Sequence, residues 1–267
     1  MNTLDEIAAL LNGILRLAGF FLLLLVLIPT TILFKRIYPS KPFLIPRIFH
    51  RLLLNTLGIR VIVSGEKPVS SPALFVSNHA SYLDIPVLGS LLSAGFVAKA
   101  DVAEWPLFGL LARLQNTIFI ERRAARAAAQ SALLQEYLAK KRSLILFPEG
   151  TSSEGLTALP FKSSLFSIVE DSSGSFPLIV QPVSVTCVEL NGFPILREDR
   201  GLYAWFGDMT MVPHLWNVFK YGRFTVDVVF HPPLTANDYP NRKDLAAACH
   251  ERVTEGIKRS LGYDRSK

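Results

Sequence analysis

ALFVSNHASYLDIPVLGSLLSAGFVAKA, residues 73–100, contains a strand, a loop, a helix and a second strand in close succession. Residues 73–77 are apolar enough for a buried strand, residues 82–92 have helical spacing, and residues 95–99 form another short strand. This order is typical of strands that pair in parallel across a helix. The stretch therefore predicts an α/β fold, and its polar loop SNHASYLD (77–84) follows the end of the first strand.

Strands and helices alternate on both sides of this stretch as well. Because parallel strands need a long crossover between them, the alternation predicts an α/β sheet with parallel pairs and with helices packed against it. Further strands are predicted at 59–65, 117–121, 143–147, 177–186 and 224–230, and helices at 46–58, 104–115, 122–142 and 242–261.

An apolar segment precedes the predicted sheet. LAGFFLLLLVLIPTTILF, residues 17–34, is just long enough for a helix that crosses a membrane. A cleaved signal peptide, a spanning anchor and a helix that dips into one leaflet all remain open, but Asp5 and Glu6 stand where a signal peptide has basic residues. Anchoring is therefore favoured. We divide the chain into a membrane anchor with a surface helix, residues 1–58, and a main domain, residues 59–267.

Basic residues are concentrated just after the apolar segment, whereas only Arg16 lies close before it. By the positive-inside rule this asymmetry places the main domain on the cytoplasmic side of the inner (cell) membrane. The two cysteines, Cys187 and Cys249, are far apart and suggest neither a disulfide framework nor a zinc site, which fits a reducing compartment. The basic residues after the segment are Lys35, Arg36, Lys41, Arg47 and Arg51.

The composition describes a globular domain that carries a membrane element. Half of the 267 residues are hydrophobic and the mean hydropathy is +0.32, yet 19% are charged, which is too many for a transporter with several spans. The net charge of +6 suits nucleic acid, anionic lipid or an acidic carrier protein, and charge alone does not choose among them.

The loop after residues 73–77 contains a histidine and an aspartate five positions apart. Transfer of a group to an alcohol needs a base near the hydroxyl, and an imidazole has a suitable pKa. His79 would take the proton, and Asp84 would hold the imidazole in the correct tautomer. On a regular helix the two side chains would point about 140° apart, so the pair requires a junction between loop and helix. In the plainer alternative, Asp84 caps a helix and His79 is an ordinary loop residue.

Two other polar segments follow predicted strands. LFPEGTSSEG (146–155) places Glu149 in a turn where Gly150 lets backbone N–H groups approach a ligand. NTIFIERR (116–123) places Arg122 at the end of a strand, where its guanidinium would suit a phosphate or a carboxylate. The alternatives are a plain surface turn and a solvated start of a helix. All three segments lie at carboxyl ends of predicted strands, where open α/β sheets bind ligands.

NHASYLD, FIER, FPEGTSS and IVQPVSV (179–185) together resemble the four ordered blocks of the 1-acylglycerol-3-phosphate acyltransferase family, over about residues 75–186. The resemblance implies the αβ glycerolipid-acyltransferase fold, a mixed sheet flanked by helices, and an enzyme that acylates a lysolipid without a covalent acyl-enzyme. It makes residues 59–267 the catalytic domain. The roles it implies are a base for His79, its orienting partner for Asp84, head-group binding for Arg122, Glu149, Gly150 and Thr151, and shaping of the acyl-donor site for Pro182.

The same resemblance implies the substrates. The donor would be a thioester of acyl carrier protein or coenzyme A, which is a substrate, so no cofactor, metal or nucleic acid is expected. Asn116 stands where the family has glycine, and both accept a left-handed backbone. Ser152 replaces an arginine, with Glu154 close behind, which favours a head group other than a phosphomonoester. Lysophosphatidate stays slightly preferred as acceptor, and the segment GDMTMVPHLW (207–216) resembles the lyso-ornithine-lipid branch, which is the alternative.

Other classes of protein fit less well. A serine hydrolase would need a G-x-S-x-G turn and a nucleotide-binding enzyme a Gly-rich phosphate loop, and the sequence has neither. A non-catalytic lipid-binding protein remains the serious rival, but lipid binding requires neither His79 nor Asp84. Three other histidines, His214, His231 and His250, are expected to be structural or exposed. The aromatic residues Phe161, Phe166, Trp205 and Trp216 are expected to lie in the core or to face the membrane.

Overall fold

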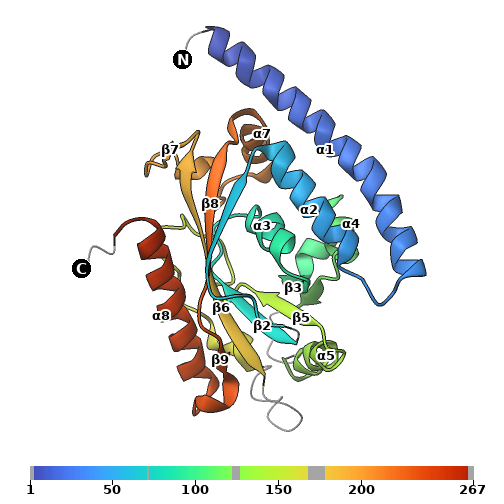
Figure 1. Cartoon of the computed structure of the whole chain (residues 1–267), viewed down its shortest axis with the longest axis vertical. Helices are drawn as coiled ribbons and strands as arrows, with labels where there is room; N and C mark the ends of the chain where they lie inside the picture. Colours follow the sequence, from blue (N-terminus) through green and yellow to red (C-terminus); the bar gives the residue numbers. More distant parts are fainter. Residues whose placement is uncertain (1–2, 71, 122–126, 168–177, 264–267) are drawn as a thin grey trace.

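A mixed sheet of nine strands organises the chain (Figure 1), in a computed structural model that describes residues 3–70, 72–121, 127–167 and 178–263. The strand order is β1-β8-β6-β2-β5-β3-β4, and β7 and β9 pair with β6. The strands are β1 (Arg60–Gly65), β2 (Ala73–Ser77), β3 (Ala94–Lys99), β4 (Ile118–Ile120), β5 (Ser143–Leu146), β6 (Ile179–Leu190), β7 (Phe193–Pro194), β8 (Phe224–Phe230) and β9 (Leu234–Thr235).

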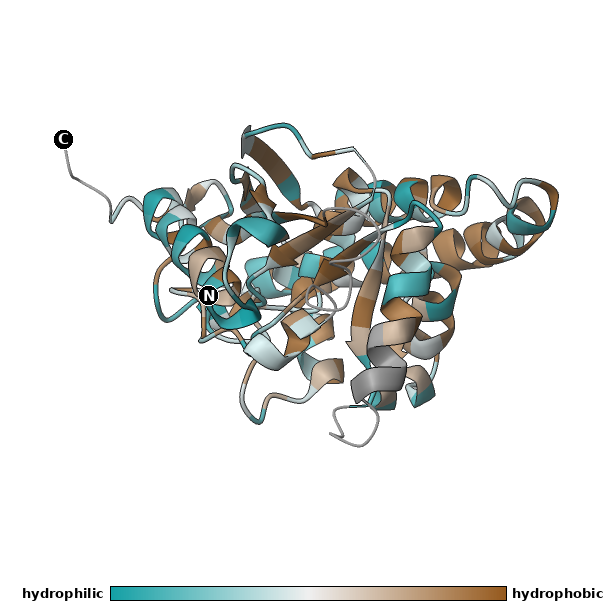
Figure 2. Ribbon diagram, turned by 90° about the horizontal axis from the view of Figure 1, so that it is seen from below, coloured by the Kyte–Doolittle hydropathy of each residue, from teal (hydrophilic) through white to brown (hydrophobic). Residues whose placement is uncertain are grey.

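Parallel pairing dominates the centre of the sheet. Strand β2 lies between β5 and β6 and is parallel to both, while β8 runs antiparallel to β6 and parallel to β1. All five residues of β2 are buried, as expected for a central strand with helices on both faces. Figure 2 shows that the central strands are hydrophobic along their length. The predicted mixed sheet is therefore confirmed.

Helices cover both faces of the sheet. Phe75 of β2 packs in a core with α1, α2, α3 and α7, whereas its neighbours Leu74 and Val76 pack against α5 and α8 on the other face. The helices are α1 (Thr3–Ile37), α2 (Leu44–Leu57), α3 (Asp84–Leu91), α4 (Phe108–Leu114), α5 (Ala127–Ala139), α7 (Met211–Tyr221) and α8 (Arg242–Ser260), with 3₁₀ turns η1 (Ala100–Glu104), η3 (Ser163–Phe166), η4 (Arg200–Leu202) and η5 (Ala236–Asp238).

The short strands β7 and β9 were not predicted, and two longer elements also differ from the prediction. The sequence predicts no helix at 211–221, where the structure has α7, because Pro213 in its first turn interrupts the helical pattern. Strand β6 continues to Leu190, beyond the predicted end at 186, because its second half pairs with β8. Neither difference could be recognised from local sequence, since packing of distant segments stabilises both elements.

Helix α1 lies along the main domain instead of projecting from it (Figure 1). Gly13 lets α1 approach α7 closely, because a Cβ there would lie 2.9 Å from the nearest atom of α7. Arg16 donates from Nη1 to the Phe219 carbonyl of α7 at 3.1 Å. Toward the other end, Lys35 donates from Nζ to Oδ1 of Asn116 at 2.8 Å. The domain thus holds α1 near both ends of its apolar segment.

The outer face of α1 remains apolar and exposed. The helix is the one described element that is long and apolar enough to cross a membrane, and 17% of its most apolar window is buried. Such a surface is unusual on a protein that contacts only water. Its exposed large side chains are Leu4, Ile7, Leu10, Leu11, Ile14, Leu15, Phe21, Leu22, Leu25, Val26, Ile32, Leu33 and Ile37.

Candidate active site

The loops that follow β2 and β5 meet at one edge of the sheet. The two strands are parallel, and their register places Val76 beside Leu146. His79 and Glu149 each lie three residues beyond this pair, so the register alone brings them close together. The backbone N–H of His79 donates to Oε1 of Glu149 at 3.1 Å. We call residues 78–83 the His79 loop and residues 147–155 the Glu149 loop.

Asp84 is the first residue of α3 and lies beside His79. Its Oδ2 is 2.9 Å from Nδ1 of His79 and accepts from the N–H groups of Ala80 and Ser81 at 2.7 and 2.9 Å. Its Oδ1 accepts from the hydroxyl of Tyr203 at 2.9 Å. The side chain is fully buried. Four hydrogen bonds therefore fix the carboxylate, and the pair lies at the junction of loop and helix that the five-residue spacing requires.

The His79 ring is oriented from two directions. Its plane stacks on the Phe147 ring with 4.2 Å between centroids and 20° between planes. A carboxylate accepts hydrogen bonds and does not donate them when it is ionised, so the proton of the neutral imidazole lies on Nδ1, facing Asp84. Nε2 is then left with a free lone pair, and 21% of the side chain is exposed. The ring can take a proton from a substrate.

Glu149 is buried beneath the His79 loop, with 2% of its surface exposed. Burial raises the pKa of its carboxyl to about 8, the charge of Asp84 adds to the rise, and the N–H groups of His79 and Leu159 limit it. The carboxyl is therefore mostly protonated at neutral pH. In the structure Glu149 accepts a hydrogen bond from the His79 backbone, and its predicted role in binding the head group stays a prediction.

Replacing Glu149 with glutamine should remove one pH-dependent contribution to stability. The folded protein binds the Glu149 proton more tightly than the unfolded chain, whose ordinary pKa is 4.5. Its contribution is therefore complete below pH 4.5 and is lost as the pH rises through about 8. We expect the Tm of the wild type to fall relative to that of Glu149→Gln between pH 5 and 8, measured by thermal unfolding in detergent. Parallel profiles would contradict this.

A third segment joins the two loops. Trp205 donates from its backbone N–H to the Ala80 carbonyl at 2.9 Å, and its own carbonyl accepts from the Ser152 hydroxyl. The N–H of Ser153 donates to the His79 carbonyl at 3.0 Å. We call residues 200–205 the Tyr203 segment. Together these bonds hold the His79 loop, the Glu149 loop and the Tyr203 segment as one unit.

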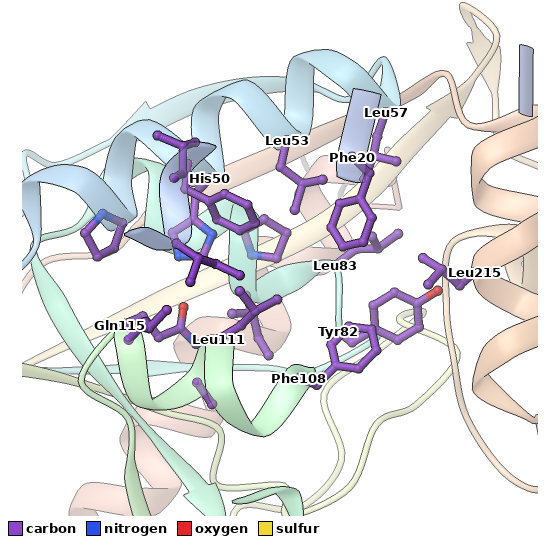
Figure 3. A pocket seen from close by; sticks show the side chains of 18 of the residues that line it. Phe20, His50, Leu53, Leu57, Tyr82, Leu83, Phe108, Leu111, Gln115 and Leu215 are labelled. Carbon is purple, nitrogen blue, oxygen red and sulfur yellow. The ribbon is translucent and has the colours of Figure 1, made fainter. Parts of the chain in front are cut away.

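An apolar cavity begins at the His79 loop. Tyr82 and Leu83 of this loop line it, and α1, α2, α4 and α7 supply Phe20, Leu53, Leu111 and Leu215 among its other walls (Figure 3). Its volume is about 160 Å³, and an apolar cavity of about 150 Å³ holds a ligand the size of benzene. The cavity therefore has room for part of an alkyl chain at the end of the His79 loop that Tyr82 and Leu83 form.

The remaining sequence-based assignments have different outcomes. Arg122 lies outside the described residues. Gly150 has a φ of +74°, in the left-handed region that favours glycine, and Asn116 has a φ of +62°, as expected for a residue in a glycine position. Thr151 is exposed, and Pro182 is buried within β6. Their roles in binding stay predictions.

Sequence reasoning missed Tyr203, whose hydroxyl holds Asp84. The two residues are 119 positions apart, and no motif marks the segment around Tyr203. Three of the histidines assigned to structural positions do have such contacts: His214 with the Tyr82 hydroxyl at 2.7 Å, His231 with the Ser184 hydroxyl at 2.6 Å, and His250 with the Ala158 carbonyl at 3.3 Å.

Comparison with known proteins gives consistent matches. The family described as "Acyltransferase" matches residues 60–186. A lyso-ornithine lipid O-acyltransferase of Rhodobacter capsulatus is 40% identical over 82% of this chain and 77% of its own, and one of Rhizobium meliloti is 37% identical over 94% and 88%. A 1-acyl-sn-glycerol-3-phosphate acyltransferase of Neisseria meningitidis is 29% identical over 80% and 79%.

A solved structure resembles the whole chain. The crystal structure of the 1-acyl-sn-glycerophosphate (LPA) acyltransferase of Thermotoga maritima matches with a TM-score of 0.60 and 21% identity, over 98% of this chain and 100% of its own. At this level of identity the match concerns the fold. The predicted glycerolipid-acyltransferase fold is thereby confirmed.

Proposed function

This chain belongs to the lysolipid acyltransferase family, and we propose that the acceptor it acylates is a lyso-ornithine lipid. The sequence slightly favoured lysophosphatidate, but relatives at 34 to 40% identity named for the ornithine lipid support the alternative better. Phosphatidate synthesis remains the second candidate, because relatives of that name also match.

Ser152 is the observation that carries this proposal. The acyltransferase block that FPEGTSS resembles usually has an arginine at this position, and a phosphomonoester with up to two negative charges benefits from each cation around it. Ser152 supplies no charge, and its hydroxyl is already used in a hydrogen bond to the Trp205 carbonyl. A head group whose anionic part is a single carboxylate carries less negative charge, so it loses less binding energy when serine stands in place of arginine.

The reaction follows from the geometry of His79. Nε2 takes the proton of the acceptor hydroxyl while its oxygen attacks the carbonyl carbon of the acyl thioester. The Asp84 carboxylate stabilises the imidazolium that forms, because it lies 2.9 Å from Nδ1. The tetrahedral intermediate then collapses, the C–S bond breaks, and the leaving sulfur takes the proton from Nε2. An ester and a free thiol result, and no acyl-enzyme forms.

The donor is an acyl thioester of acyl carrier protein or of coenzyme A, and no cofactor or metal takes part. Both carriers are anionic, and a chain with a net charge of +6 attracts either of them. Part of the acyl chain would occupy the apolar cavity, which begins at Tyr82 and Leu83 of the His79 loop. Arg122 and Thr151 remain candidates for contact with the acceptor.

An acyl-transfer assay with parallel acceptors tests the acceptor. Detergent-solubilised protein is offered a labelled acyl thioester with lyso-ornithine lipid or with lysophosphatidate, and product from the ornithine lipid is expected. Product from lysophosphatidate alone would overturn the proposed acceptor. If neither lipid is acylated, a lipid-binding role gains support.

Restoring the missing cation should shift this preference. For Ser152→Arg, we expect the ratio of kcat/KM for lysophosphatidate to that for lyso-ornithine lipid to rise about tenfold or more, because a hydrogen bond to a charged group contributes about 1.5–3 kcal/mol. Ser152→Ala is the matched control, since it removes the bond to Trp205 without adding a charge. An equal change of the ratio in both variants would contradict the role of charge.

Helix α1 is long and apolar enough to anchor the chain in a membrane. Because Arg16 and Lys35 both contact the main domain, a crossing orientation would draw that domain into the bilayer. We therefore place α1 in the plane of one leaflet, with its exposed apolar face toward the acyl chains. The basic residues that follow the apolar segment support a leaflet on the cytoplasmic side.

This orientation predicts that both ends of α1 stay on one side of the membrane. Single cysteines at Thr3 and Tyr38, which are both exposed and lie at the two ends of α1, should react with a membrane-impermeant maleimide in inverted vesicles and not in intact cells. The native Cys187 and Cys249 are buried and give a low background. Labelling of Thr3→Cys from the outside would show that α1 spans the membrane.

A further inference from the structure

Arg200 is a buried cation without a partner in the described part of the chain. Only 6% of its surface is exposed, and burial lowers the pKa of its guanidinium, which still remains charged at neutral pH. It forms no ion pair and donates no side-chain hydrogen bond among the described residues. The guanidinium nitrogens are not among the buried polar atoms that lack a partner. Since they have no partner among the described residues, they must reach solvent at the tip of the side chain.

The backbone of Arg200 is tied to the catalytic pair. Arg200 begins the turn η4, and its carbonyl accepts from the N–H groups of Tyr203 and Ala204 at 3.0 and 2.8 Å. Tyr203 in turn donates to Asp84. Arg200 and Asp84 also lie around the same thiol, because, beside the larger effect of burial, the charge of Arg200 lowers the pKa of Cys187 and the charge of Asp84 raises it. Arg200 is therefore a fixed cation near the reacting groups.

A carboxylate lies near this cation. Glu154 is partly exposed, and it stands between Ser153, which donates to the His79 carbonyl, and Gly155. Gly155 has a φ of +73°, and a Cβ there would lie 3.0 Å from the Cβ of Ala80, so the Glu149 loop passes close to the His79 loop. The hydrogen bond from Ser152 to the Trp205 carbonyl joins this loop to the Tyr203 segment, so Glu154 and Arg200 lie on adjoining segments, and the two form no ion pair among the described residues.

Two opposite charges that do not neutralise each other suit a ligand that carries both. We propose that Arg200 binds the carboxylate and Glu154 the ammonium group of an amino-acid head group on the acceptor. This assignment rests on the proposed function, for which ornithine supplies both groups. A phosphomonoester would be attracted by Arg200 but repelled by Glu154, so the same pair discriminates against lysophosphatidate.

Acceptors with one charge blocked test this assignment. Wild type, Arg200→Gln and Glu154→Gln are assayed with lyso-ornithine lipid, with its carboxyl methyl ester, and with the lipid acetylated on its free amine. We expect Arg200→Gln to lower kcat/KM about 10- to 100-fold for the free acid and little for the ester. Glu154→Gln should lower it for the free amine and little for the acetylated lipid, and should improve the use of lysophosphatidate.

The controls separate recognition from folding. Arg197→Gln and Glu198→Gln change exposed charges three and two residues before Arg200, and they should leave all kcat/KM values unchanged. Equal losses with blocked and unblocked lipids would overturn the assignment and make Arg200 a structural cation. If Arg200→Gln does not fold, Glu154→Gln still tests the ammonium half. A wild type that acylates no form of the ornithine lipid would instead refute the proposed function.

Discussion

Replacing His79 with alanine should lower kcat by about 10²–10⁴-fold and leave the fold intact, because a positioned general base contributes about that much to proton transfer. The network around Asp84 does not depend on the ring, since Ala80, Ser81 and Tyr203 still donate to its carboxylate. Steady-state acyl transfer from a labelled thioester measures the loss, and circular dichroism with thermal unfolding checks the fold.

Two further variants sharpen this experiment. His79→Gln can still donate a hydrogen bond toward Asp84 but is not a base at neutral pH, so it should be as inactive as the alanine variant. His250→Ala is the matched control, because His250 lies on α8 and contacts the Ala158 carbonyl away from the pair. Wild-type turnover in His79→Ala would refute the mechanism.

Asp84→Asn should separate charge from geometry. An asparagine can direct its oxygen toward His79, Ala80 and Ser81 and its amide toward the Tyr203 hydroxyl, which can accept. All four contacts survive, but the negative charge that stabilises the imidazolium is lost. We expect kcat to fall by about 10²–10⁴-fold with a small change in Tm, in the same assays.

Asp84→Ala should show a different pattern. It leaves the N–H groups of Ala80 and Ser81 without an acceptor in a buried site, and each such loss costs about 1–3 kcal/mol of stability. Tyr203→Phe removes one bond only and should destabilise by about 1.5–3 kcal/mol while retaining more activity than either Asp84 variant. If the asparagine variant is as unstable as the alanine variant, Asp84 acts mainly as a structural residue.

Local sequence predicted the parts of the fold and site that depend on neighbouring residues. The continuous apolar run at 73–77 indicated a central strand, and the spacing of His79 and Asp84 required the junction at which they lie. The sequence also indicated that Glu149 lies near His79, because both residues follow the carboxyl ends of parallel strands and the register of such strands is regular.

Contacts across long separations could not be predicted in this way. Tyr203 reaches Asp84 over 119 residues, and α7 is stabilised by packing against α1, which no local pattern encodes. The burial of Glu149 could not be predicted either, because a Pro-Glu-Gly turn has the same sequence whether it is buried or lies on the surface. Arg200 had no signal at all, since its burial depends on the position of the whole Tyr203 segment.

Helix α1 has two faces with two different neighbours. One face supplies Phe20 and Ile28 to the wall of the cavity, and the other exposes apolar side chains along the same helix. An alkyl chain that leaves a bilayer beside α1 would therefore move from the exposed face of this helix to the face that lines the cavity, and both faces are apolar. It need not cross water, where each exposed methylene would cost about 0.8 kcal/mol. In the proposed in-plane orientation, α1 would lead the acyl chain of a substrate from the bilayer to the cavity.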